Sequence, residues 1–119
     1  MEEQKQNIIL EKSFQFTIKA IEFVEILEDK RKFVVANQLL KSASSIGANV
    51  REAQHAESPN DFIHKLKIAA KEAEESEYWI DVCNVAKNYP SNYELLVELK
   101  EIQKLLTKII HTTKNKVVK

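Results

Sequence analysis

The sequence predicts an all-α protein, an antiparallel four-helix bundle with up-down-up-down topology. Apolar residues recur every three to four positions along most of the chain, which is the spacing of one face of an α-helix. The 119 residues include only one glycine and two prolines, too few for the tight turns of a hairpin-rich β fold. A chain of this length fits one domain, and the short breaks between its helices force consecutive helices to run antiparallel.

The first helix is expected over residues 6–28 and carries two apolar tracks side by side. Together the tracks make a face wider than the seam of a two-stranded coiled coil. One track holds Ile9, Phe16, Ala20, Phe23 and Leu27, and the other holds Leu10, Phe14, Ile21 and Val24. The charged residues 29–32 form the turn that follows.

The second helix is expected over residues 33–56. Its core positions are Val35, Leu39, Ala43, Ile46, Val50 and Ala53. Gly47 lies in a run of small residues and costs about 1 kcal/mol relative to alanine inside a helix. We therefore expect a close contact with a neighbouring helix, or a bend, at Gly47.

The third helix is expected over residues 59–87. Ser58 is a suitable N-cap, Pro59 suits the first helical position, and Asp61 lies where a capping box places its acid. The core stripe holds Phe62, Leu66, Ala69, Ala73, Ser76, Ile80 and Cys83.

The fourth helix is expected over residues 91–113. Ser91 and Glu94 have the spacing of a second capping box. The core positions are Leu95, Leu99, Ile102, Leu106 and Ile109. The lysine-rich residues that follow are expected to fray.

Composition excludes several classes of protein. Eighteen basic and eighteen acidic residues give a net charge of zero, so no global field attracts nucleic acid or anionic lipid. Cys83 is the only cysteine, which rules out an intrachain disulfide, and it is expected to be a small buried hydrophobe. The N-terminus is too charged for a signal peptide, and no apolar run is long enough to span a membrane. We expect a cytoplasmic protein with no membrane contact.

The second half of the third helix is apolar around almost its whole circumference. A helix of this kind is buried on more than one side, and tyrosine and tryptophan are enriched at interfaces. This pattern predicts an oligomer interface formed by Ile68, Tyr78, Trp79 and Val82. The alternative is a scatter of exposed apolar residues, which is normal for a monomer.

Two pairs of polar residues have a spacing found in metal-binding bundles. Glu52 and His55, like Asp61 and His64, are three positions apart and share a helix face. Both pairs flank a turn rather than the middle of the bundle, so solvated or salt-bridged side chains are favoured over a metal site. No nucleophile–base pair, phosphate loop or cysteine pair is present. We expect no enzyme activity and no catalytic, cofactor or metal residues.

Further polar residues lie near the core of the second and third helices. Ser45, Asn49 and Glu52 follow one side of the second helix, and Glu72 and Glu75 could meet such donors from the third. Ordinary helix–helix hydrogen bonding without a ligand is the favoured interpretation, because buried polar groups need partners in any protein.

A local basic stripe follows the fourth helix on the side opposite its leucines. It consists of Lys100, Lys104, Lys108 and His111, and Lys67 and Lys71 form a smaller pair on the third helix. Such a stripe can bind phosphates through counterion release. A solvated helix face is the alternative, and Glu98 and Glu101 dilute the stripe.

Residues 38–82 carry a family resemblance. The matching residues are Gln38, Leu39, Leu40, Ser45, Ile46, Gly47, Ala48, Asn49, Val50, Glu52, Ala53, Asp61, Phe62, Ile63, Lys65, Leu66, Ala69, Lys71, Glu72, Ala73, Glu75, Tyr78 and Trp79. In order and spacing they resemble the bacterial four-helix bundle family known as the 23S rRNA intervening-sequence proteins. The family also resembles the accessory variability determinant of diversity-generating retroelements, a basic protein that works with a reverse transcriptase and RNA.

The resemblance implies an antiparallel bundle that often assembles as a cyclic pentamer, encoded in insertions within bacterial large-subunit rRNA genes or elsewhere. It supplies no agreed catalytic residues. We therefore expect a non-enzymatic homo-oligomeric scaffold or binding protein, a pentamer, with RNA or an RNA-associated protein as its partner. The alternatives are a protein–protein interaction module without nucleic-acid binding and, less favoured, a metal-binding bundle.

Overall fold

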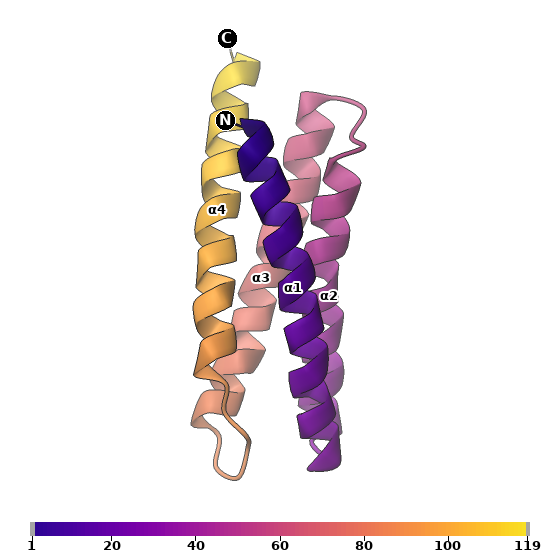
Figure 1. The fold of residues 1–119 in the computed structure, drawn as a ribbon, viewed down its shortest axis with the longest axis vertical. Helices are drawn as coiled ribbons and strands as arrows, with labels where there is room; N and C mark the ends of the chain where they lie inside the picture. The colour runs from indigo at the N-terminus through magenta and orange to yellow at the C-terminus, as the bar shows by residue number, and fades with distance from the viewer. Residues whose placement is uncertain (1, 119) are drawn as a thin grey trace.

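A computed structural model describes residues 2–118, with side chains from residue 8 to residue 116. It is a rod with principal extents of 52 × 21 × 19 Å (Figure 1). The four helices are α1 (Glu2–Asp29), α2 (Phe33–Ala53), α3 (Pro59–Val85) and α4 (Tyr93–Val118). The predicted all-α fold with up-down topology is confirmed. No helix of the described chain is both long enough and apolar enough to cross a membrane.

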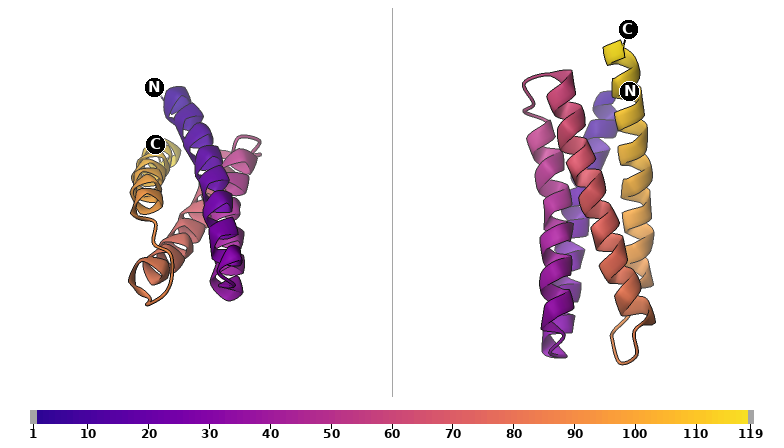
Figure 2. Two further views of the ribbon diagram at one scale, coloured as in Figure 1. Left: turned by 60° about the horizontal axis from the view of Figure 1, so that its bottom comes forward. Right: turned by 180° about the vertical axis from the view of Figure 1, so that it is seen from behind.

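Each helix contacts its two neighbours around the bundle. The contacting pairs in the described chain are α1–α2, α2–α3, α3–α4 and α1–α4, so α1 and α3 occupy opposite corners, as do α2 and α4. Figure 2 shows α1 running obliquely across one side of the bundle, with α3 seen from the other side between α2 and α4. α1 begins, and α4 ends, at the same pole of the bundle (Figure 1).

The core follows the predicted apolar stripes, with a few exceptions. Phe62 is only half-buried, and Ile63 is buried beside it. On the second track of α1, Val24 is buried, whereas Phe14 and Ile21 are 48% and 39% exposed. A helix at the corner of a bundle is covered only on its inner side, so the outer part of this wide apolar face remains in solvent.

One polar pair crosses the core between α2 and α3. The hydroxyls of Ser42 and Ser76 are fully buried and 2.9 Å apart, and Ser76 donates to Ser42. Ser42 in turn donates to the carbonyl oxygen of Leu39 at 3.3 Å. Because both hydroxyls need partners, this bond fixes the axial register of the two helices.

The turn between α1 and α2 has the geometry of a Schellman motif. The amide of Lys32 donates to the carbonyl of Leu27, and the amide of Arg31 donates to that of Glu28, both at 2.8 Å. Arg31 adopts the left-handed conformation that this motif requires, with φ of 64°. At the other side of the same pole, the Lys32 ammonium lies 4.7 Å from the centre of the Tyr89 ring, which joins this turn to the α3–α4 connection.

The predicted end of α2 at residue 56 is wrong, because the helix ends at Ala53. The amides of Gln54, His55 and Ala56 each bond to a carbonyl three residues back, which tightens the chain into the turn before α3. The predicted start of α3 is confirmed, since the Ser58 hydroxyl accepts from the amide of Asp61 at 3.1 Å. The Asp61 carboxylate accepts from the amide of Glu57 instead of that of Ser58.

The bounds of the other helices also differ from the prediction. α3 ends at Val85 instead of residue 87, and α4 begins at Tyr93 because Asn92, not Ser91, caps it. The Asn92 side-chain oxygen accepts from the backbone amide of Leu95 at 2.9 Å, and the backbone amide of Asn92 donates to the side-chain oxygen of Asn84 at 2.6 Å. α1 begins at Glu2 and α4 continues to Val118, so the expected fraying after residue 113 does not begin there. Lys119 lies outside the described residues.

Candidate nucleic-acid interface

The predicted basic stripe divides into two parts. The Lys100 ammonium lies 2.6 Å from the Glu77 carboxylate of α3, and Gln103 donates to the same carboxylate at 2.9 Å. The hydrogen bond from Lys100, and then that from Gln103, hold the pKa of Glu77 below its ordinary value, and Glu77 raises the pKa of Lys100. The charge of Lys100 is therefore compensated by Glu77 within the α3–α4 seam, and we no longer count Lys100 as part of the stripe.

The upper part of the stripe remains charged. Lys104, Lys108 and His111 are exposed. Neither lysine lies within ion-pair distance of a described carboxylate. The side-chain amide nitrogen of Asn115, a neutral group, lies 3.2 Å from the Nε2 atom of His111.

Lysines of α3 join this part of the stripe across the seam. The nearby ammonium of Lys114 on α4 lowers the pKa of Lys67 on α3. Lys71 lies one helical turn from Lys67 and is also exposed. We call the five lysines of this region the basic face: Lys67, Lys71, Lys104, Lys108 and Lys114.

The basic face could not be assembled from the sequence alone, because it depends on the register between two helices. The signal was present as two separate lysine groups, at residues 67 and 71 and at residues 100–114. Lysine presents a compact charge without directional recognition. A cluster of this kind can neutralise phosphates regardless of base sequence.

The predicted oligomer interface does not form one exposed patch. Tyr78 is 60% exposed, whereas Ile68, Trp79 and Val82 are half-buried. The rings of Tyr78 and Trp79 meet edge to face, with centroids 4.9 Å apart. The indole nitrogen of Trp79 is buried and has no hydrogen-bond partner in the described chain.

The predicted polar contacts between helices are made only in part. Ser45 donates to the carbonyl of Lys41 and Asn49 donates to that of Ser45, both at 2.8 Å and both within α2. Among the described residues, no hydrogen bond joins either side chain to Glu72 or Glu75. Glu52 does cross to α3, where Lys65 lies 3.2 Å from its carboxylate.

The residues weighed as metal ligands have other surroundings. Glu52 pairs with Lys65, the Asp61 carboxylate accepts from the amide of Glu57 in the turn before α3, and His55 and His64 are exposed. Among the side chains of residues 8–116, no group of three or more histidine, cysteine, aspartate or glutamate residues is arranged to hold a metal ion.

Cys83 occupies its predicted place in the core and is 1% exposed. Burial raises the pKa of its thiol to about 11, because the thiolate would lose its hydration. The side chain is thus a protonated, inert part of the core at neutral pH.

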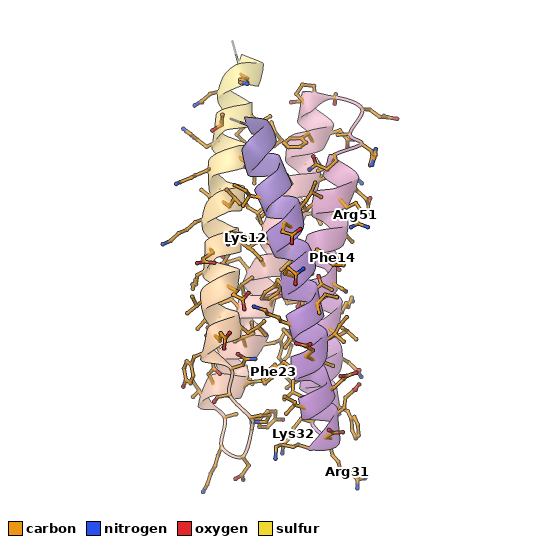
Figure 3. The ribbon with its side chains drawn as sticks, viewed as in Figure 1. Lys12, Phe14, Phe23, Arg31, Lys32 and Arg51 are labelled. Atoms are coloured by element: carbon orange, nitrogen blue, oxygen red, sulfur yellow. The ribbon has the colours of Figure 1, made fainter. Side chains whose placement is uncertain are left out.

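A groove between α1 and α2 was missed by the sequence analysis. It has a volume of about 400 Å³ and is lined by Leu10, Ser13, Phe14, Thr17, Ser44, Gly47, Ala48, Arg51 and Glu52. Figure 3 shows Phe14 on α1 and Arg51 on α2 at one side of the molecule, and the guanidinium carbon lies 5.9 Å from the ring centre. The available signal was the second apolar track of α1, which was assigned to the core.

Comparison with known proteins identifies a family and shows a close structural similarity to a solved protein. The model of the family described as 23S rRNA-intervening sequence protein matches residues 5–108. A crystal structure of a protein of unknown function from the S23 ribosomal protein family of Bacteroides thetaiotaomicron is 40% identical, with a TM-score of 0.82. The match covers 90% of this chain and 98% of the other. No curated protein matches the chain.

Proposed function

Because the chain belongs to the 23S rRNA-intervening sequence protein family, we propose that it is a non-enzymatic, cytoplasmic scaffold that self-assembles and binds RNA. The proposed assembly is a homo-pentamer. The proposed RNA contact is the basic face of α3 and α4, acting directly or together with an RNA-associated protein. The resemblance to the accessory variability determinant of diversity-generating retroelements, a protein that works with RNA, supports the RNA part of this proposal.

The observation that carries the proposal is the segregation of charge in a chain with no net charge. The lower half of the α3–α4 side combines Lys100 with Glu74, Glu77 and Asp81, whose carboxylates all raise the pKa of that lysine. In the upper half, Lys67 of α3 lies beside Lys114 of α4, and none of the five lysines of the basic face lies within ion-pair distance of a described carboxylate. Repetition around an oligomer would place several such faces on one particle and raise its affinity by avidity.

The direct test is filter binding of RNA over a salt series. Wild-type affinity should fall steeply with salt. A plot of the logarithm of the binding constant against the logarithm of the salt concentration should have a slope of about −0.7 to −0.9 for each neutralised phosphate. The variant Lys104→Glu with Lys108→Glu should lose most of its RNA retention, and the slope should become shallower. Helicity should not change, because both side chains are exposed.

A matched variant controls for the change in net charge. Lys30→Glu with Lys87→Glu alters the charge equally, at exposed positions in the two connections far from the basic face. It should bind RNA almost as well as wild type. Equal losses in the two double variants, or no binding at low salt, would reject the basic face as an RNA site.

A second function is favoured by a different observation, the exposed apolar residues of α1. Phe14, Ile18 and Ile21 follow one another at helical spacing and are each 39–48% exposed. In this alternative the chain is a protein–protein interaction module without an RNA role. Absence of RNA binding at low salt, combined with self-association, would select it.

A further inference from the structure

Two neighbouring sides of the bundle carry rows of apolar residues that the bundle itself does not fully cover. The first is the groove side, between α1 and α2. Phe14, Ile18 and Ile21 recur at steps of four and three along the outer edge of α1. A second depression of about 430 Å³ continues the groove and shares Leu10, Phe14 and Arg51 with it.

Small residues form the α2 wall of this groove. Ala48 is exposed and has no side chain beyond Cβ, so a neighbouring subunit can approach the backbone of α2 there, whereas at Gly47 the close neighbour is Thr17 of α1. Arg51 closes the upper part of the groove and lies over the Phe14 ring. Its guanidinium is exposed and has no carboxylate partner in the described chain.

The second apolar side lies between α2 and α3. Residues at steps of four, three, four and three run along α3 and share one edge of it. We call them the α3 stripe: Ile68, Glu72, Glu75, Trp79 and Val82. The three apolar members are half-buried, so each keeps part of its surface in solvent.

Charges give the contact a direction. Glu72 and Glu75 have no ion-pair partner among the described residues, and the same holds for Arg51 in the groove. Two acids also line the groove and its continuation: Glu52, which is paired with Lys65, and Glu11. Because like charges facing each other oppose contact, the acidic stripe favours the orientation that places its carboxylates at Arg51. Along the α3 stripe the two carboxylates lie between Ile68 at one end and Trp79 and Val82 at the other, so apolar residues flank the charges on both sides.

We infer that the α3 stripe of one copy packs into the α1–α2 groove of the next copy. The Glu72 carboxylate of one subunit then faces Arg51 of its neighbour, and the apolar members of the α3 stripe cover Phe14, Ile18 and Ile21. This inference rests on the proposed self-assembly and specifies which surfaces meet in it.

The two surfaces differ, so the contact is head-to-tail, and repeating it gives either a ring or a filament. They lie on adjacent sides of the bundle that share α2, so each added subunit turns relative to the last instead of continuing in a straight line. This arrangement favours a closed ring. It leaves the α3–α4 side, with the basic face, uncovered.

A mixing experiment tests the head-to-tail contact. Phe14→Glu disables the groove, and Glu72→Arg with Glu75→Arg disables the α3 stripe. Light scattering should give wild type as an oligomer and each variant alone as a monomer. An equimolar mixture should give a one-to-one heterodimer, because the intact stripe of the first variant fits the intact groove of the second.

Controls separate this inference from the proposed self-assembly. Val97→Glu changes a 59% exposed apolar residue on the outer side of α4 and should keep the wild-type mass. Circular dichroism checks the helicity of each variant, and Ile21→Glu replaces Phe14→Glu if the latter unfolds. A monomeric wild type would overturn the self-assembly itself.

Other outcomes would overturn only the assigned surfaces. If the wild type is oligomeric and the groove variants keep its mass, another surface holds the subunits together. If both variants are monomers and their mixture stays monomeric, the contact does not join the groove to the α3 stripe. Restoration of the wild-type mass by combining Arg51→Glu with Glu72→Arg in one chain would support the facing charges.

Discussion

Between α1 and α2, Gly47 leaves room for Thr17, and no ion pair joins these two helices in the described chain. Between α3 and α4, Lys100 and Gln103 both reach the Glu77 carboxylate. A close backbone contact depends on side-chain size, whereas an exposed ion pair depends on protonation and salt. The first seam should therefore fail when a side chain grows, and the second should weaken when the carboxylate is protonated.

The outer surfaces of the two helix pairs differ in the same sense. The α1–α2 side is apolar around its groove, and the α3–α4 side is basic in its upper half. A bundle with an apolar surface on one side and a basic surface on another can contact a protein and a polyanion at the same time, since neither surface obstructs the other. Four sets of substitutions test how far the difference between the two pairs extends.

The largest effect is expected at Gly47. A Cβ there would lie 3.2 Å from the Thr17 hydroxyl and 3.4 Å from the carbonyl oxygen of Ser13, so a longer side chain must push α1 away. Gly47→Leu should lower the free energy of unfolding by about 3 kcal/mol in urea denaturation. Ala48→Leu, at the exposed neighbouring position, should have little effect. Equal stability of Gly47→Leu and wild type would contradict a seam limited by size.

The junction between the two helix pairs should respond next. Ser42→Ala removes the acceptor of the buried Ser76 hydroxyl and should cost about 2 kcal/mol. The double variant Ser42→Ala with Ser76→Ala leaves no unpaired hydroxyl and should recover much of this loss. Thermal or urea unfolding of the three proteins measures the difference, and additive losses would show that the two hydroxyls do not act as a pair.

The two connections at the lower pole should differ by a smaller amount. Arg31 and Asn88 both have positive φ, at 64° and 70°. Arginine is strained in this region, so Arg31→Gly should stabilise the protein by about 1 kcal/mol. Asparagine tolerates the left-handed region better, so Asn88→Gly should change stability less. A larger gain at Asn88 would reverse the assigned order of strain.

The smallest effect is expected at Glu77. The Lys100 hydrogen bond, and then the Gln103 hydrogen bond, hold its pKa below the ordinary 4.5. A carboxyl with a lowered pKa stabilises the folded state above the unfolded pKa, and this contribution is lost as pH falls through the folded pKa. Below about pH 4.5, wild type should therefore lose more stability than Glu77→Gln.

Urea midpoints for the Glu77 pair, measured on both sides of that pH, give the comparison. The difference should also shrink in high salt, because the ion pair is partly exposed. Midpoints of the two proteins that fall in parallel would remove Glu77 from the pH response. Gly47→Leu, by contrast, should lose the same stability at each pH.

Helix positions could be predicted well from the sequence, because burial repeats with the helical period. Ser58 and Pro59 gave the start of α3 correctly, since a capping serine before a proline has few alternatives. Asn92 was missed because Ser91, one residue earlier, is an equally good cap, and only the path of the loop decides between them. Local sequence does not encode which of two competent caps the chain brings into position.

The surface was predicted less well, because it depends on which helices become neighbours. Phe14 and Ile21 follow the period of the core, and only the corner position of α1 leaves them in solvent. Lys100 belongs to the lysine stripe by spacing, yet the α3–α4 register places it against Glu77 and brings Lys67 near Lys114. Only contacts between residues far apart in sequence decide which apolar residues stay exposed and which lysines stay unpaired. Spacing along one helix does not contain this information.

The single thiol of Cys83 can report how often the bundle opens transiently. A thiol reagent can modify it only when the helices part, because burial both shields the sulfur and keeps it protonated. The labelling rate of the native protein therefore counts opening events without a denaturant. Since no other cysteine competes for the reagent, occupancy of either outer surface by a partner could be followed as a slowing of this one reaction.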